Sequence, residues 1–431
     1  MNLDNPITVP IESRYNRFST VLFYGVCALV GVFIFFSPFP YTTAITNISF
    51  YLAIVMALML ILFRTFPVVV KTPLTYPFTI FFLWSCLSLI WALNFENTLS
   101  DLRGHLLNYL ILFFLLINFF NSKNRLNLLV WIVVISAVVF SVVGMVYYYV
   151  IMDSAIMKIR FGGLLAGGRY VWTELPVNAV GTLSITAILF CFYFYHKKIS
   201  LWYRLFLVLG GGIVFVATIL TQSRGTLAAV IVAGITLFLI KNKKLLPVFL
   251  VIMILAVVFS PFKNRIDTRN LSARMKINYI VMQVVKDHPL LGIGFGMMTF
   301  SETLDIKEYV HRAPPEYRPV DINHPHSWLL DIMVRLGIIG LGLFMLIIFT
   351  FFKMSWHVIR YPRDNTIREL GIYVDIAFIS YFVIGLAEPV FLFSASAIIF
   401  YILMAMMTIL WMLNRDESPI FEKPQCISES L

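Results

Sequence analysis

Long apolar segments alternate with short polar connections along most of the chain. The segments are apolar over roughly 16 residues or more, enough to cross much or all of a hydrocarbon core of about 30 Å. We expect helices at residues 20–37, 44–63, 77–93, 106–120, 127–151, 174–195, 201–221, 225–240, 245–261, 327–352, 371–390 and 393–413. The pattern therefore predicts membrane spans rather than the core helices of a soluble domain.

These segments predict an all-α integral membrane protein with about 12 transmembrane helices. The chain is expected to form one polytopic domain, residues 1–431, with one large connection at residues 261–326. An amphipathic stretch at residues 271–286 predicts a helix within that connection, which is expected to lie on the membrane surface. The first span is expected to stay, because the N-terminal region lacks the cleavage site of a signal peptide.

Lysine and arginine gather in the connections that follow every second expected span. These residues are Arg64, Lys71, Lys123, Arg125, Lys197, Lys198, Lys241, Lys243, Lys244, Lys353, Arg360, Arg363 and Arg368. Cytoplasmic connections carry such an excess, whereas long translocated connections are exempt from the bias. Both termini are therefore predicted inside and the connection 261–326 outside, in the periplasm, for a protein of a bacterial inner membrane.

The composition agrees with a membrane environment and excludes several other classes of protein. Hydrophobic residues make up 60% of the chain and charged residues 13%, against roughly 45–50% and about 25% in soluble domains. The net charge is +11, but the basic residues are not gathered in a soluble domain, so no nucleic-acid partner is expected. The four cysteines form no CxxC pair and the histidines no ligand cluster, so neither a disulfide nor a metal site is predicted.

A few cations lie in short outer connections, against the general bias. They are Arg103, Lys158, Arg160, Arg169 and Arg224. Arg224 lies in the turn at residues 221–226 between two expected spans, and a charge held near hydrocarbon is costly and usually has a partner. Two interpretations remain open. Such arginines reach lipid phosphate with their long side chains, or they form a site for an anionic, lipid-linked headgroup.

Two histidines stand at the end of the large connection. His324-Pro325-His326-Ser327 comes directly before the next expected span, so the imidazoles should lie at the outer surface, where a helix begins. Histidine exchanges a proton near neutral pH, which makes the pair candidates for acid–base catalysis. Ordinary loop histidines without a special role are the alternative.

Three further features of this region have a structural interpretation. The glycines of residues 292–296 follow GxGxG spacing without a surrounding βαβ unit, so they predict close packing or a sharp bend rather than a nucleotide loop. Asp331 and Arg335 are spaced i,i+4 and are expected to neutralise each other on one face of a helix. Asp375 and Glu388 have no neighbour in sequence that indicates a role.

Three short motifs within residues 170–350 resemble those of the O-antigen ligase and polymerase superfamily. They are Thr221-Gln222-Ser223-Arg224, Leu271-Ser272-Ala273-Arg274, and His326-Ser327 followed by Gly337 and Gly340. Members of this superfamily are membrane glycosyltransferases that move glycan from an undecaprenyl diphosphate carrier. The order and placement of the motifs beside the hydropathy pattern carry the resemblance.

The resemblance implies a role for each matched residue. By position, Arg224 and Arg274 bind the diphosphate of the carrier and His326 is the catalytic residue. Accessory candidates are Arg160, Arg169 and His324. Guanidinium groups suit phosphate oxygens and stabilise a departing diphosphate. The resemblance further implies a reaction without a metal or other cofactor. This chain departs from the family pattern at Ser327, where asparagine is common, and at Arg335. Neither departure is expected to alter the reaction, but either can alter acceptor contacts.

The predicted function is ligase-like transfer of a glycan from undecaprenyl diphosphate to the lipid A core at the periplasmic face, with membrane lipids around the protein. A polymerase of the same superfamily, which joins carrier-linked repeat units, is the alternative. A transporter or flippase is disfavoured, because it would place its polar residues near the bilayer midplane, often with internal repeats.

Overall fold

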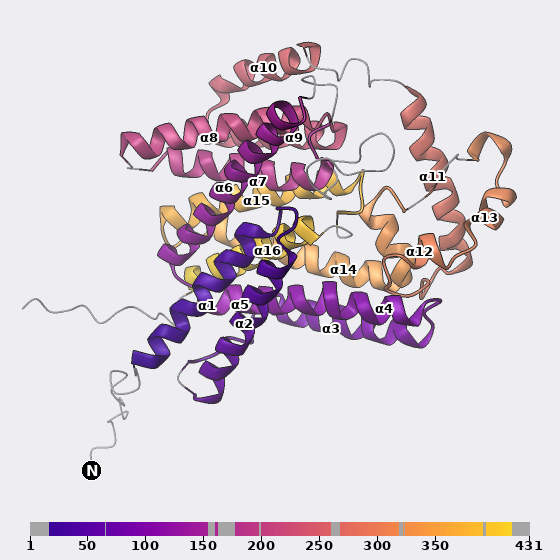
Figure 1. The fold of residues 1–431 in the computed structure, drawn as a ribbon, viewed down its shortest axis with the longest axis horizontal. Coiled ribbons are helices and arrows are strands. Elements are labelled where there is room, and N and C mark those ends of the chain that lie inside the picture. The colour runs from indigo at the N-terminus through magenta and orange to yellow at the C-terminus, as the bar shows by residue number, and fades with distance from the viewer. Residues whose placement is uncertain are drawn as a thin grey trace, which may run out of the picture.

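The computed structural model describes residues 17–64, 66–153, 160–162, 177–197, 200–259, 268–318, 322, 324–390 and 394–415. Every regular element in these residues is a helix (Figure 1). The α-helices are α1 (Arg17–Phe36), α2 (Thr43–Leu62), α3 (Thr75–Leu87), α4 (Phe95–Asp101), α5 (Asn108–Phe119), α6 (Lys123–Val146), α7 (Val177–Tyr195), α8 (Leu201–Leu220), α9 (Arg224–Lys241), α10 (Leu246–Phe259), α11 (Thr268–Asp287), α12 (Thr299–Glu302), α13 (Ile306–Arg312), α14 (Trp328–Arg360), α15 (Asn365–Gly385) and α16 (Ser394–Arg415). Short 3-10 or π segments are η2 (Ser88–Ile90), η3 (Leu102–Leu107), η4 (Tyr147–Ile151), η5 (Lys243–Leu245) and η7 (Pro315–Tyr317). The predicted all-α membrane fold is confirmed.

The helices match the expected spans closely in position. Within the described residues, nine helices are long and apolar enough to cross a membrane. Three further helices coincide with expected spans: α3 and α10 are shorter, and α15 carries Arg368, Glu369 and Asp375. A multi-pass membrane protein follows from these helices, and the number of about 12 crossings stays a prediction.

The expected connection at residues 94–105 is helical instead, so that prediction was wrong. One continuous helix runs over Phe95–Phe119, made of α4, η3 and α5. It begins early because the side chain of Asn94 caps it, accepting a hydrogen bond from the backbone N–H of Asn97 at 2.9 Å. Such a cap satisfies a backbone donor that the first helical turn leaves open. Polar residues in this first part hid the helix from the hydropathy pattern.

The centre of the bundle is formed by α7 and α16. Buried residues make up 94% of the span of α16 and 89% of that of α7, against 28% for α2. In Figure 1 these two helices and α15 run through the middle of the molecule, and α11, α12 and α13 lie together at one end. We call this end of the bundle the loop end and the other the opposite end.

A break in α14 holds the large connection in place. Gly337 has φ +68°, outside helical geometry, and the backbone around it bonds to the segment at residues 289–294. Ile338 N–H donates to the carbonyl of Pro289 at 2.9 Å, and Ile293 N–H donates to that of Val334 at 2.9 Å. Gly292 has φ +70°, and a Cβ on it would lie 2.5 Å from the carbonyl oxygen of Arg335, so the close packing and sharp bend predicted for the glycines of residues 292–296 are confirmed at Gly292. The contact fixes the first turns of α14, which directly follow the two histidines.

A buried ion pair lies beside this break. Arg335 bonds to Asp331 one turn earlier in α14, and it also donates to the carbonyl of Phe295 at 3.1 Å. Both charged residues are buried, with 3% and 5% of their surface exposed. The predicted neutralisation is therefore confirmed. Arg335 additionally ties the large connection to α14.

The apolar face of α11 packs inside the protein. Its buried residues are Ile277, Ile280, Val281, Val284 and Val285, and they form one cluster with Val334 of α14 and with Phe300 and Tyr309 of the same connection. The expected placement of this face on the membrane surface was wrong, because α14 and the neighbouring short helices cover it. Sequence alone does not distinguish an apolar face that meets lipid from one that meets protein.

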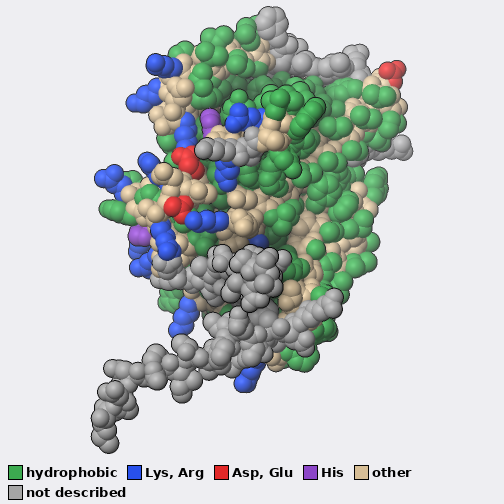
Figure 2. Space-filling model, turned by 90° about the vertical axis from the view of Figure 1, so that its left-hand side faces the viewer, with side chains coloured by type: hydrophobic (Ala, Val, Ile, Leu, Met, Phe, Trp, Pro, Cys, Tyr) green, Lys and Arg blue, Asp and Glu red, His purple; other side chains and the backbone are tan. Residues whose placement is uncertain are grey.

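Charged residues are unevenly distributed over the molecule. Figure 2 looks onto the opposite end and shows that lysine and arginine side chains gather there, with few acidic ones between them. Two of these lysines form ion pairs with acids of α15 or its N-cap, Lys123 with Asp364 and Lys241 with Glu369. The distribution agrees with the positive-inside bias. A cytoplasmic location of this end stays a prediction.

Replacing Gly337 by alanine should destabilise the protein. A Cβ there would lie 2.0 Å from the carbonyl oxygen of Leu290, and the left-handed backbone alone costs about 1–3 kcal/mol for other residues. We expect a clear fall in the melting temperature of the purified protein in detergent. Gly342→Ala is the matched control in the same helix, because a Cβ there meets nothing within 4 Å. Equal melting temperatures for the two variants would contradict the role of the break.

Candidate active site

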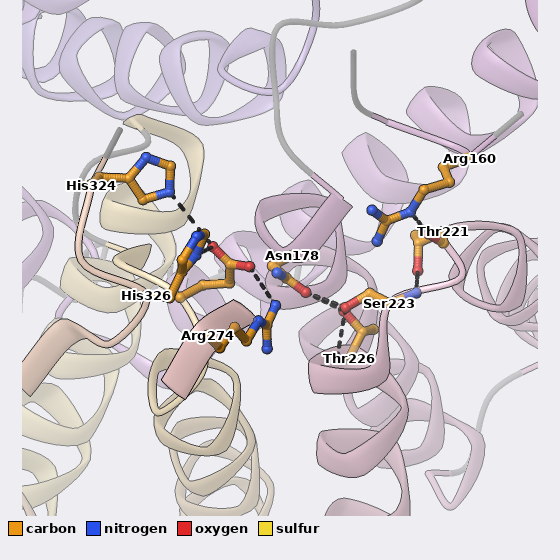
Figure 3. A network of polar contacts seen from close by, with 9 residues as sticks. Arg160, Asn178, Thr221, Ser223, Thr226, Arg274, His324 and His326 are labelled. Atoms are coloured by element: carbon orange, nitrogen blue, oxygen red, sulfur yellow. Dashed lines mark hydrogen bonds and ion pairs between the residues drawn. The ribbon is translucent and has the colours of Figure 1, made fainter. Parts of the chain in front are cut away.

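Glu388 brings three predicted site residues together at the loop end. It lies in the turn between α15 and α16, and Arg274 of α11 donates to its Oε1 at 2.9 Å. Nδ1 of His326 lies 3.4 Å from its Oε2, and Nε2 of His324 lies 4.0 Å from the same oxygen. Figure 3 shows the side chains of His324, His326 and Arg274 turned toward one another. No role was predicted for Glu388, so it is the main residue that pattern analysis missed.

The carboxylate of Glu388 stays ionised although only 13% of its side chain is exposed. Burial would by itself raise the pKa. The hydrogen bonds from His324 and His326 and the charges of His326 and Arg274 outweigh burial and lower the pKa of Glu388 from 4.5 to about 2. An acid with cationic partners on several sides favours its charged form in this way. The cluster therefore contains a permanent negative charge at neutral pH.

The backbone that carries the histidines is anchored by Trp328, the first residue of α14. Trp328 is buried and its ring meets Phe344 and Phe382 edge-on, with centroids 5.0 and 4.8 Å apart. A Cβ on Gly385 would lie 2.7 Å from the Trp328 ring, so the start of α14 is pressed against the end of α15. His326 is two residues away, which explains how a loop histidine acquires a fixed position next to the α15–α16 turn.

The turn between α8 and α9 forms the second part of the site. Ser223 caps α9, accepting from Thr226 N–H at 3.1 Å, and its hydroxyl donates to the side-chain carbonyl of Asn178 on α7. Gln222 is buried with φ +50°, a conformation that is uncommon for residues other than glycine. Arg224 is therefore placed at the first position of a helix N-terminus, where the backbone dipole favours anions.

The two parts of the site adjoin each other. A Cβ on Gly225 would lie 3.7 Å from Cβ of Ala387, the residue directly before Glu388. Arg160 reaches the same turn, since its Nε donates to the carbonyl of Thr221 at 3.1 Å (Figure 3). The structure thus brings Arg160 and the start of α9 to the loop end, where Arg274 also lies. Arg169 lies outside the described residues.

His324, His326 and Glu388 are also a possible metal-binding group. One ligand atom from each lies within 4.8 Å of the others, and two imidazoles with a carboxylate are a known donor set for zinc. Arg274 bonds to the same carboxylate, so its positive charge would repel a cation bound there. The expectation of a metal-free site stays a prediction that a chelator can test.

The ionised Glu388 should contribute to stability in a pH-dependent way. Its pKa is lower in the folded protein than in the unfolded chain, so its contribution is complete above about pH 4.5 and is lost as the pH falls towards 2. At pH 6 we expect Glu388→Gln to unfold more easily than wild type by roughly 3 kcal/mol. Melting temperatures of both proteins in detergent, measured from pH 7 to pH 3, should converge below pH 4.5.

Glu369→Gln is the matched control for this measurement. Glu369 pairs with Lys241 at the opposite end and has 42% of its side chain exposed, and an exposed pair contributes only about 0–1 kcal/mol. A difference between wild type and Glu388→Gln that stays constant down to pH 3 would contradict the ionised state of Glu388.

Comparison with known proteins gives partial matches, and the family match includes most of the site. Residues 210–345 match the family described as O-antigen ligase. Two proteins, from Rickettsia prowazekii and Rickettsia typhi, each described as a "putative polysaccharide ligase", are 27% and 26% identical over 142 residues, which is 30% of this chain and 33% of theirs. A third, from Rickettsia bellii, is 27% identical over 113 residues, or 26% of each chain. The matches thus span about a third or less of these relatives' own length.

The matched family segment contains the residues that the sequence motifs singled out. Arg224, Arg274, His324 and His326 lie inside residues 210–345, whereas Glu388 lies beyond them. The resemblance inferred from those motifs is thereby confirmed over this part of the chain. Residues 210–345 of this chain are therefore similar to the O-antigen ligase family.

Proposed function

We propose that the protein transfers a glycan from undecaprenyl diphosphate to a hydroxyl group of the lipid A core, at the periplasmic face of a bacterial inner membrane. The observation that carries this proposal is the convergence of Arg274, His324 and His326 on the buried Glu388. A cation suited to phosphate and an imidazole suited to proton transfer thus lie on one carboxylate, next to the start of α9. The similarity to O-antigen ligases supports glycan transfer in general.

Arg274 and Arg224 would hold the diphosphate of the donor. Glu388 bonds to one nitrogen of Arg274, and a guanidinium has five N–H donors, so contact with phosphate is compatible with this ion pair. Arg224 adds a second cation at the N-terminus of α9, whose dipole favours an anion. Negative charge grows on the diphosphate as the glycosidic bond breaks, and preorganised cations lower the energy of that state.

His326 would act as the general base, with Glu388 as its positioning residue. If Nδ1–H of His326 donates to Glu388, Nε2 carries the lone pair that accepts a proton. The acceptor hydroxyl oxygen attacks the anomeric carbon, and its proton passes to Nε2. The bond from that carbon to the diphosphate breaks, and its electron pair leaves with the phosphate oxygen. The carboxylate stabilises the imidazolium that results.

Two observations favour ligation over the alternatives. The relatives from Rickettsia carry the description of polysaccharide ligases, and the spacing of His326, Gly337 and Gly340 resembles that of ligases. A polymerase would share the arginines but would have to hold two carrier-linked glycans. A transporter would place its polar cluster near the midplane, whereas Glu388 and its partners lie between helix ends.

Substitutions at His326 and Arg274 should affect different kinetic constants. In a transfer assay with defined carrier-linked glycan, His326→Ala should lower kcat by about 10²–10⁴-fold, the usual contribution of acid–base catalysis. Arg274→Ala should instead weaken donor use by roughly 10- to 150-fold in kcat/KM, because a charged hydrogen bond contributes about 1.5–3 kcal/mol. Arg274→Lys should fall between the wild type and Arg274→Ala.

His324→Ala is the control for the base, because His324 lies farther from Glu388 and should matter less. A fall of less than about tenfold for His326→Ala, at normal protein level, would leave the histidine a structural role only. A chelator should not change turnover. If activity is lost with a chelator and restored by zinc, the general-base role is wrong and a metal bound by His324, His326 and Glu388 takes its place.

Deletion of the gene should separate ligation from polymerisation. A strain without the protein should accumulate long glycan on undecaprenyl diphosphate and should carry a bare lipid A core, as seen by gel analysis of lipopolysaccharide and of carrier-linked glycan. Restoration of the gene should restore long glycan on the core, and the His326→Ala gene should not. A deletion strain whose core carries a single repeat unit would identify a polymerase instead.

A further inference from the structure

An apolar cavity of about 500 Å³ lies between α7, α8, α9 and α10. Its lining consists almost wholly of aliphatic and aromatic side chains, with Val230 and Leu237 on α9, Leu207 and Phe215 on α8, and Phe249 on α10. Two glycines of α8, Gly211 and Gly212, also face it. The glycan chemistry at the loop end uses none of these residues, so the cavity needs another explanation.

The cavity and the candidate active site share helix α9. Arg224 begins that helix, and Val230 and Phe238 mark the first and last of its residues that line the cavity. At a rise of 1.5 Å per residue, the cavity runs from about 9 Å to about 21 Å along α9 from the diphosphate site. One leaflet of a membrane is about half of a 30 Å hydrocarbon core. Along α9 the cavity therefore begins on the site's side of the midplane and continues past it, and Tyr195 at the end of α7 and Leu245 before α10 extend its lining to the opposite end.

We propose that this cavity holds the polyprenyl chain of the donor while its diphosphate is bound at the loop end. The inference rests on the proposed function and adds a binding subsite to it. A lipid with its headgroup at Arg224 can fill the deeper half of the cavity only if its chain is longer than one leaflet. A polyprenyl carrier meets that condition, and a phospholipid with its headgroup at the same face does not.

Helix α10 gives the cavity a side that can admit a long chain. Most of its side chains are exposed, while Met253 is buried, and it meets α9 where Phe249 lies against Gly234. A Cβ on Gly234 would come within 2.1 Å of that ring. Figure 1 shows α10 at the edge of the bundle beyond α8 and α9. A chain can thus enter sideways from the membrane without crossing the tightly packed centre around α7 and α16.

Filling the cavity should reduce the benefit of a long carrier chain. Gly212 lines the cavity, and a Cβ there meets nothing within 4 Å, so Gly212→Phe adds a ring without a backbone clash. We would measure KM for the same glycan on undecaprenyl diphosphate and on a diphosphate with a single isoprene unit, whose chain ends before the cavity begins. The variant should raise KM for the long donor by about tenfold or more, because lost burial of a few methylene groups is sufficient for that change. KM for the short donor should not change.

Gly342→Phe is the matched control, because a Cβ on this glycine of α14 also meets nothing within 4 Å and Gly342 does not line the cavity. An unchanged KM of Gly212→Phe for the long donor, in protein that melts like wild type, would overturn the proposal. Native mass spectrometry could instead show phospholipid bound to wild type and absent from Gly212→Phe. Together with an unchanged KM, that result would assign the cavity to phospholipid.

A second measurement keeps this test separate from the proposed function. A polyprenyl diphosphate that carries a photoreactive group near the end of its chain and no glycan should label residues of α7 to α10 in wild type and label them less in Gly212→Phe. Such labelling would support the cavity even if the protein transferred no glycan from either donor. Labelling spread evenly over the lipid-facing helices, with active transfer, would refute the cavity and leave the proposed function standing.

Discussion

The ionised carboxylate of Glu388 is the interaction on which the arrangement of the site depends. A buried charge at the edge of a membrane is stable only with partners, and Glu388 takes Arg274, His324 and His326 as its partners. Arg274 comes from α11, and the two histidines come from the residues directly before α14. One requirement, the compensation of a single charge, therefore draws α11, the start of α14 and the α15–α16 turn to one point. The start of α9 joins them through the contact of Gly225 with Ala387.

The rest of the loop end supplies the rigidity that this arrangement needs. The break at Gly337 lets the segment at residues 289–294 bond to α14, while the apolar face of α11 packs on the same helix. Arg274 thus belongs to a helix that is fixed along much of its length, and His326 belongs to a backbone fixed by Trp328. Groups held by packed helices keep a geometry that a freely moving loop would lose.

Much of the fold followed from hydropathy, because a span must be apolar over a fixed length whatever its neighbours are. The predicted span at residues 106–120 was shorter than the observed helix Phe95–Phe119. The first turns of this helix hold polar residues such as Asp101 and His105, which contact protein groups. The predicted membrane-surface location of the apolar face of α11 was wrong for the converse reason. This face packs against α14, which is distant in sequence. Hydropathy reports the preference of a segment but not the identity of the surface that satisfies it.

The sequence alone predicted only those site residues that stand out from their local surroundings. Arg224 drew notice as a cation in a tight turn, and His326 as one of two histidines before a span. Glu388 and Asn178 could not be assigned, because their partners lie far away in the chain: Arg274 is 114 positions and Ser223 is 45 positions distant. An acid near the end of the expected span at residues 371–390, in a protein with several arginines in short connections, was the signal available.

The ion pair of Asp331 and Arg335 has a consequence for the membrane potential. A lone charge that moved across the whole membrane would exchange about 2.3 kcal/mol with the field per 100 mV. The two residues are one turn apart on α14 and bond to each other, so any displacement moves equal and opposite charges together. The field then does almost no net work on this segment. The pairing therefore leaves the geometry of the break in α14 insensitive to changes in the voltage across the membrane.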